Sequence, residues 1–372
     1  MSNSRGISIF MCGDVMTGRG IDQILPYPSI PVIYEPFMKS ALGYVHLAEE
    51  LNGPIKRPVG FSYIWGDALN ELKLASPDAR IINLETAVTK SDDYWKGKEI
   101  NYRMNPKNIP CITSAGIDCC SLANNHVLDW GYAGLTETLE TLKSANVKCA
   151  GAGLNAKEAG TPVIIDLGRK GRVVFFSYGS ETSGIALNWA ALEKRSGVNL
   201  IEDFSDAAVS RIKKEVREVK KKGDAVIASL HWGGNWGYKV PKEQREFAHA
   251  LVAEAGIDII HGHSSHHAKG IEVHEGHLII YGCGDFINDY EGIGGYEHYR
   301  GDLGLMYFAE VDPESGNLTG LRMTPTQMKN FRVNRASHED AEWLTAVLNR
   351  EGKQFGAKVE MDADNRLELR WD

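Results

Sequence analysis

The sequence predicts a layered α/β protein, and two observations carry this prediction. Continuous apolar runs of this length, rich in Val and Ile, are typical of strands covered on both faces. They recur along the chain and stop at polar clusters, at residues 7–14, 79–86, 118–126, 173–181, 224–234, 258–266 and 278–286. Helical patterns lie between them, so strand and helix alternate. In such α/β cores, ligands bind where strands end and loops begin.

Three segments between these runs carry apolar residues at helical spacing. They are 132–145, 204–222 and 241–255, and the last opens with Pro241, which the first turn of a helix tolerates. The basic residues of 213–222 alternate with apolar ones, which indicates a solvated helix face.

Two further regions complete the predicted organisation. Residues 27–62 are rich in Pro and Tyr and predict an insertion with a helix at about 36–51. Residues 303–325 predict a hairpin that turns at 314–317, followed by a helix at 338–350 and an extended tail. We therefore expect a main domain over residues 1–335, with residues 336–372 packed on it.

Composition excludes several classes of protein. The chain has 372 residues, 43% of them hydrophobic and 24% charged, which is typical of a folded globular protein. A formal net charge of −8 argues against nucleic acid as a partner. The N-terminus lacks the apolar region of a signal peptide, and no apolar window is long enough to span a bilayer. Six cysteines without CxxC spacing indicate buried, reduced thiols, so we expect a cytoplasmic protein.

Most of the predicted strands end in a side chain that can bind a metal or move a proton. A single Asp or Asn after a strand is usually a turn former or a helix cap, but several at successive strand ends indicate a common site. Mixed carboxylate, amide and imidazole ligands suit Mn²⁺, Zn²⁺ or Fe²⁺. We therefore predict one or two divalent ions, and a metal-free site is the open alternative. The residues are Asp14, Glu85, Asn125, His126, His231, His263 and His266.

An ordered set of motifs resembles a known family, the CapA or poly-γ-glutamate capsule biosynthesis proteins. The family's fold is related to that of the calcineurin-like metallophosphoesterases. The resemblance therefore implies a calcineurin-like metallophosphoesterase-type layered α/β sandwich. The motifs are GDVM at 13–16, NLET at 83–86, LANNHVLDWG at 122–131, LHWG at 230–233, GHSSH at 262–266 and GDF at 284–286.

The same resemblance implies a metal-ligand set. Asp14 and His266 would hold a first ion, and Glu85 would stand where a bridging Asp usually stands. The second ion would be completed by Asn125, His231 and His263.

The resemblance also implies a proton donor and shows two departures. His126 matches the histidine that protonates a leaving group or stabilises the transition state, with Asp129 to orient it. Met16 replaces a histidine ligand of the phosphoesterase pattern, and GHSSH is one residue longer than the usual GHxH. The lost ligand makes one ion, or none, plausible.

Two further segments supply candidate substrate contacts. The glycine-rich segment 290–304 carries His298 and Arg300, which we predict to act in catalysis and in substrate binding, respectively; a solvated surface loop is the alternative. Trp236 is predicted to form the floor of a substrate groove. The pattern does not need His261, His267, His274 or His277.

Three functions follow from these residues taken together with the resemblance, which implies the γ-glutamyl substrate, the epimerase and the capsule setting. The first is a metal-dependent hydrolase or transferase acting on a peptide-like, γ-glutamyl substrate or on a phosphorylated one. The second is a metal-independent peptide epimerase, in which Asp14 and His298 transfer protons on opposite faces of a Cα. The third is a non-catalytic protein of capsule or polymer assembly. The sequence does not define the oligomeric state.

Overall fold

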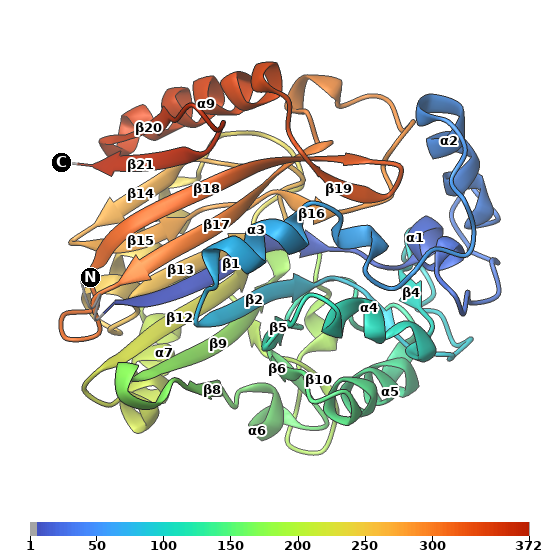
Figure 1. Ribbon diagram of the computed structural model, residues 1–372. Helices are drawn as coiled ribbons and strands as arrows, with labels where there is room; N and C mark the ends of the chain where they lie inside the picture. Colours follow the sequence, from blue (N-terminus) through green and yellow to red (C-terminus); the bar gives the residue numbers. More distant parts are fainter. Residues whose placement is uncertain (1–5, 372) are drawn as a thin grey trace.

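The computed structural model describes residues 6–371, which form two β-sheets packed face to face with helices on their outer faces (Figure 1). The larger sheet has ten strands. Its order is β20 (Ala357–Met361), β21 (Leu367–Trp371), β18 (Leu318–Lys329), β17 (Leu303–Val311), β1 (Ile7–Val15), β2 (Ala79–Leu84), β5 (Cys119–Ser121) and β6 (Lys148–Ala150), with β16 (Asp285–Ile287) beside β1 and β19 (Arg332–Arg335) beside β18.

The second sheet has seven strands and is largely parallel. Its order is β11 (Leu200–Ile201), β9 (Arg172–Ser180), β12 (Asp224–His231), β13 (Ile259–His263), β15 (His277–Ile280) and β14 (Ile271–His274), with β8 (Val163–Asp166) beside β9. Two short pairs complete the strands: β10 (Gly197–Val198) with β7 (Ala152–Gly153), and β3 (Ala87–Val88) with β4 (Arg103–Met104).

Helices form close to the predicted segments 132–145, 204–222, 241–255 and 338–350, and four further α-helices of the described chain were not predicted. The α-helices are α1 (Arg19–Ile24), α2 (Leu42–Asn52), α3 (Ala68–Ala75), α4 (Pro110–Thr113), α5 (Gly131–Ser144), α6 (Ala156–Ala159), α7 (Asp206–Val219), α8 (Lys242–Ala253) and α9 (His338–Gly352). Short 3-10 turns are η1 (Tyr63–Trp65), η2 (Pro106–Asn108), η3 (Gly168–Lys170), η4 (Glu181–Ser183), η5 (Leu187–Trp189), η6 (Glu297–Tyr299) and η7 (Lys353–Phe355). The predicted layered α/β sandwich is confirmed.

Alternate residues of the central strands face different cores. In β1, Ile9 and Met11 pack between the sheets, whereas Phe10 faces the helices beyond the larger sheet. In β12, Ile227 packs between the sheets and Val226 faces α7 and α8. Successive side chains of a strand point to opposite faces, so burial of both faces produces a continuous apolar run.

One predicted strand proves to be two. The run 278–286 divides into β15 of the smaller sheet and β16, which pairs with β1 of the larger sheet. Gly284 has a positive φ of 78°, and a Cβ on Gly13 would lie 1.7 Å from its carbonyl oxygen. Only glycines allow this close backbone approach. The crossing between sheets places Asp285 opposite Asp14.

The insertion and the C-terminal region pack on these sheets. Helix α2 begins at Leu42, later than predicted, and it contacts α1. The predicted hairpin is confirmed as the antiparallel pair β17 and β18. Strand β21 pairs with β18, so the end of the chain extends the larger sheet, and α9 lies along it (Figure 1). No helix within residues 6–371 is long and apolar enough to cross a membrane.

Candidate metal centre

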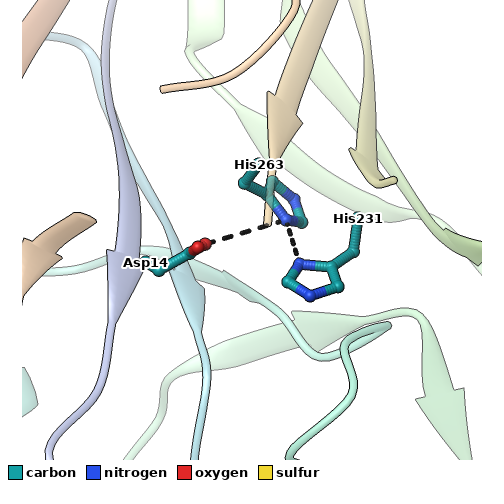
Figure 2. A group of neighbouring side chains, drawn as sticks. All are labelled: Asp14, His231 and His263. Atoms are coloured by element: carbon teal, nitrogen blue, oxygen red, sulfur yellow. Dashed lines mark hydrogen bonds and ion pairs between the residues drawn. The ribbon is translucent and has the colours of Figure 1, made fainter. Parts of the chain in front are cut away.

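Polar side chains from both sheets meet at the carboxyl ends of the parallel strands. Asp14 stands near the end of β1, while His231 and His263 are the last residues of β12 and β13 and lie opposite each other in register. Figure 2 shows the two imidazoles facing the carboxylate. One ligand atom from each of the three residues lies within 4.8 Å of the others, and all three side chains are buried. This arrangement is able to hold a metal ion.

The contacts inside this group are short. His231 Nδ1 lies 2.7 Å from His263 Nδ1, and His263 Nδ1 lies 3.9 Å from Asp14 Oδ1 (Figure 2). The side chain of Asn83 donates to Asp14 Oδ1 over 2.7 Å, and the backbone N–H of Ser264 donates to Asp14 Oδ2 over 3.2 Å. Ser264 has a φ of 103°, an unusual conformation for a residue with a side chain, and such strain concentrates at ligand sites.

A buried chain of hydrogen bonds sets the tautomer of His263. His261 Nε2 lies 2.8 Å from the carbonyl of Cys12, which can only accept, so Nε2 carries the proton and Nδ1 is an acceptor. The hydroxyl of Ser229 therefore donates to His261 Nδ1 and accepts from His263 Nε2 at 2.7 Å. His263 Nδ1 is left with a lone pair directed at the centre.

The tautomer of His231 follows from its own neighbours. Its Nδ1 lies 2.7 Å from His263 Nδ1, which has no proton, so His231 Nδ1 carries the proton and donates it to this hydrogen bond. Its Nε2 faces Asn125 Oδ1 at 3.2 Å and Glu85 Oε1 at 3.8 Å. Burial lowers the pKa of His231 and of His263 well below the usual range, so both rings are neutral. One proton therefore lies between the two Nδ1 atoms. A cation that replaced this proton would be held by both nitrogens, so the donor set fits a divalent ion.

Two buried carboxyl groups of the centre are weaker acids than usual. Burial and the nearby charge of Asp285 raise the pKa of Asp14 to about 7. Burial also raises the pKa of Glu85 well above its usual range, and the charge of Asp14 adds to this effect. Carboxyl groups crowded in this way hold a proton in common until a cation replaces it.

A second group shares Asp14 with the first. His266 Nδ1 lies 2.9 Å from Asp285 Oδ1, and ligand atoms of these two residues and Asp14 lie within 4.8 Å of one another. Burial disfavours the imidazolium of His266, but the charges of Asp285 and Asp14 outweigh this and raise its pKa. The structure makes Asp14 the residue common to both groups, whereas the sequence-based ligand set assigned the shared place to Glu85.

His126 lies beside this centre in a network of its own. Its Nδ1 lies 2.6 Å from Asp129 Oδ2, which as a carboxylate accepts the Nδ1 proton, and its Nε2 points toward Glu85 Oε1 at 3.7 Å. Lys98 donates to the other Asp129 oxygen and to the backbone carbonyl of Asn125. Burial lowers the pKa of His126 to about 4, so its Nε2 is a free base near neutral pH.

The predicted substrate contacts lie next to the metal groups. Trp236 and Arg300 line one cavity of about 400 Å³, and the ring of Trp236 lies 5.2 Å from that of His266. Arg300 pairs with Asp302 and Asp340.

The predicted base His298 lies on η6 and is exposed, with its ring 4.0 Å from that of Tyr299, whereas Asp14 is fully buried. The pairing of Asp14 with His298 in proton transfer stays a prediction.

Several residues of the site were not in the sequence-based set. Asn83 contacts Asp14, and Asp285 contacts His266. Both residues lie within motifs used for the family resemblance. His261 was set aside, although the sequence HGHSSH places it two residues before His263 on the same face of β13. Lys98 follows no strand and carries no sequence signal.

The fold and the site together define a class of protein. The chain matches the family described as "Bacterial capsule synthesis protein PGA_cap" over residues 8–290, and it belongs to this family. The resemblance to CapA proteins is thereby confirmed.

Particular relatives make the comparison more specific. The chain is 44% identical over 364 residues to a "Probable polyglutamine synthesis accessory protein" of Mycobacterium tuberculosis, covering 98% of this chain and 96% of that one. It is 28% identical to the "PGA biosynthesis protein CapA" of Bacillus subtilis, over 56% of this chain and 52% of that one. It is 24% identical to the "Capsule biosynthesis protein CapA" of Bacillus anthracis, over 76% and 60% of the two chains. A solved structure aligns at 10% identity over 85% of this chain and 98% of that one, with a TM-score of 0.37, which is too low to support an argument.

Proposed function

We propose that this protein is a metal-dependent enzyme of poly-γ-glutamate synthesis that hydrolyses or transfers a γ-glutamyl bond. The family description and the names of the relatives support the biological setting. The observation that carries the chemistry is the pair of neutral imidazoles whose Nδ1 atoms face each other at 2.7 Å beside Asp14. A phosphorylated substrate is the second class that this donor set suits.

Asp14, His231 and His263 would hold the ion. Glu85 and Asn125 lie beside this group, facing His231 Nε2. A bound divalent ion supplies Lewis acidity toward a carbonyl or phosphoryl oxygen and lowers the pKa of a bound water. A further ion would be held by the group of Asp14, His266 and Asp285.

His126 is proposed as the residue that moves the proton. Asp129 holds the Nδ1 proton, so Nε2 can accept a proton from an attacking group and return it to the leaving group. The ammonium of Lys98 fixes Asp129 from its other side, and this keeps the ring of His126 oriented.

The substrate would extend into the cavity lined by Trp236 and Arg300. This cavity also includes Tyr290, whose ring lies 5.2 Å from that of His266. An aromatic wall suits a peptide-like chain, and Arg300 would have to leave Asp302 or Asp340 to bind a carboxylate of that chain.

Turnover assays with metal-stripped and Mn²⁺-loaded or Zn²⁺-loaded protein test the proposal. Release of amine from γ-glutamyl oligomers and release of alcohol from phosphate esters are measured in parallel, with His231→Ala as the inactive control. We expect metal-dependent turnover of the γ-glutamyl substrates. Metal-independent deuterium uptake at a substrate Cα would instead favour epimerisation and contradict the proposal, as would absence of metal-dependent turnover in both assays.

A further inference from the structure

We propose a second, separate metal-binding site on the outer side of the smaller sheet, formed by His249, Glu272 and His274. One ligand atom from each of these residues lies within 4.8 Å of the others. None of the three belongs to the centre around Asp14. The inference is independent of the proposed function.

Two rigid elements bring these side chains together. His249 stands on α8, and Glu272 and His274 stand two apart on β14, so their side chains leave the same face of the strand. His249 Nε2 lies 3.0 Å from Glu272 Oε1, and the rings of His249 and His274 stack at 3.7 Å with an interplanar angle of 2°. Ligands on a helix and a strand are positioned more firmly than ligands on loops.

The carboxylate of Glu272 is buried and oriented. Its Oε2 accepts a hydrogen bond of 2.6 Å from the hydroxyl of Tyr281, which leaves Oε1 toward His249. A hydrogen bond behind a metal ligand is the usual means of fixing its orientation. Arg245 also reaches Oε1, at 3.2 Å, and its side chain is 38% exposed, so it is free to swing away when a cation enters.

The donor set indicates the kind of ion. Two imidazoles and one carboxylate suit Zn²⁺, with the fourth position open to water. Zinc–ligand distances of about 2.0–2.2 Å place tetrahedral ligand atoms about 3.3–3.5 Å apart. Because the two rings are parallel, their in-plane lone pairs do not converge, and one imidazole must rotate out of the stack to coordinate the same ion.

Counting bound Zn²⁺ or Co²⁺ by titration of the metal-stripped protein tests this site. The double variant His249→Ala/His274→Ala should lose one equivalent, while the centre at Asp14 keeps its own. His338→Ala, a change at an exposed histidine outside the cluster, is the matched control and should lose none. His249→Gln/His274→Gln, which keeps more of the packing, serves if the alanine variant fails to fold.

Two further variants separate a built site from chance binding to surface histidines. Arg245→Ala should tighten binding at this site because a competing cation is removed. Tyr281→Phe should weaken it by about 10–100-fold because the carboxylate loses its orienting hydrogen bond. Equal metal content in the wild type and in a folded double variant would overturn the inference, as would insensitivity to both Arg245→Ala and Tyr281→Phe.

Discussion

The histidines of the centre differ in role because their hydrogen-bond partners differ. His263 is linked through Ser229 to His261, and this link directs its Nδ1 lone pair toward Asp14. In His126, by contrast, the Nδ1–H donates a hydrogen bond to Asp129, which leaves the Nε2 lone pair free to accept a proton. We therefore propose that the same kind of side chain is a ligand in one place and a base in another.

The first residue-scale prediction concerns His126. His126→Ala should lower turnover by about 10²–10⁴-fold, since a positioned proton carrier is lost. Metal content and melting temperature should stay near those of the wild type, because none of the candidate metal groups within residues 6–371 includes this ring. Parallel turnover, metal analysis and thermal melting check the prediction. Full turnover in a correctly folded variant would contradict the assigned role.

The second residue-scale prediction concerns pH. The raised pKa of Asp14, about 7, means that its carboxyl is protonated in the metal-free protein below that pH, and an ion must displace this proton. His231 and His263 stay neutral over the same range because burial lowers their pKa values. Metal affinity should therefore fall by up to about tenfold per pH unit below 7. Calorimetric titration in buffers of different ionisation enthalpy measures the proton release, and equal affinity at pH 6 and pH 8 would contradict it.

Much of this residue set could be predicted from the sequence, because strand ends carry a recognisable signal. Asp14, Glu85, His126, His231, His263 and His266 all lie at or near the centre. Lys98 could not be predicted, because it reaches Asp129 from an irregular segment whose path depends on tertiary packing. The exposure of His298 could not be predicted either, since a glycine-rich loop leaves its direction open.

At the scale of elements, the division of the run 278–286 decides the shape of the site. An apolar run does not reveal that its strand crosses from one sheet to the other, and Gly282 and Gly284 are the only local signs of a break. The crossing brings Asp285 beside Asp14 and His266. For this reason Asp285 was recognised only as part of a motif.

A buried arginine joins three other elements near the centre. Arg19, at the start of α1, forms two hydrogen bonds with Asp289, which follows β16, and one with Glu35 of the insertion. Its guanidinium also lies over the ring of Tyr102, which contacts His126 edge to face. The insertion is thereby tied to the elements that surround the centre.

This network gives an element-scale prediction. Asp289→Asn weakens two charge-assisted hydrogen bonds of Arg19 but leaves the buried Arg19–Glu35 pair, so it should lower the free energy of unfolding by about 1–3 kcal/mol. Glu246→Gln, which breaks an exposed pair with Lys242 on α8, should cost no more than about 0.5 kcal/mol. Urea unfolding compares the two variants. Similar small losses in both would show that the Arg19 network does not hold these elements together.

At the scale of the whole molecule, the candidate metal centre depends on how the two sheets meet. The larger sheet supplies Asp14, and the smaller sheet supplies His231 and His263, so these side chains come together only when both sheets are packed (Figures 1 and 2). The layered fold class could be predicted from alternating elements. The register that brings the two strand ends together could not, because it depends on the packing of side chains between the sheets.

The most direct test of the central claim is metal analysis of the protein after reconstitution with Mn²⁺ or Zn²⁺ and removal of excess ion. The measurement is made in the His249→Ala/His274→Ala background, so that only the centre at Asp14 is counted, and it is repeated with His231→Ala/His263→Ala added. We predict that the second change removes about one equivalent, so that only an ion held by Asp14, His266 and Asp285 stays bound after it. Less than about 0.1 equivalent in the folded protein before the second change would contradict a metal centre at Asp14, His231 and His263.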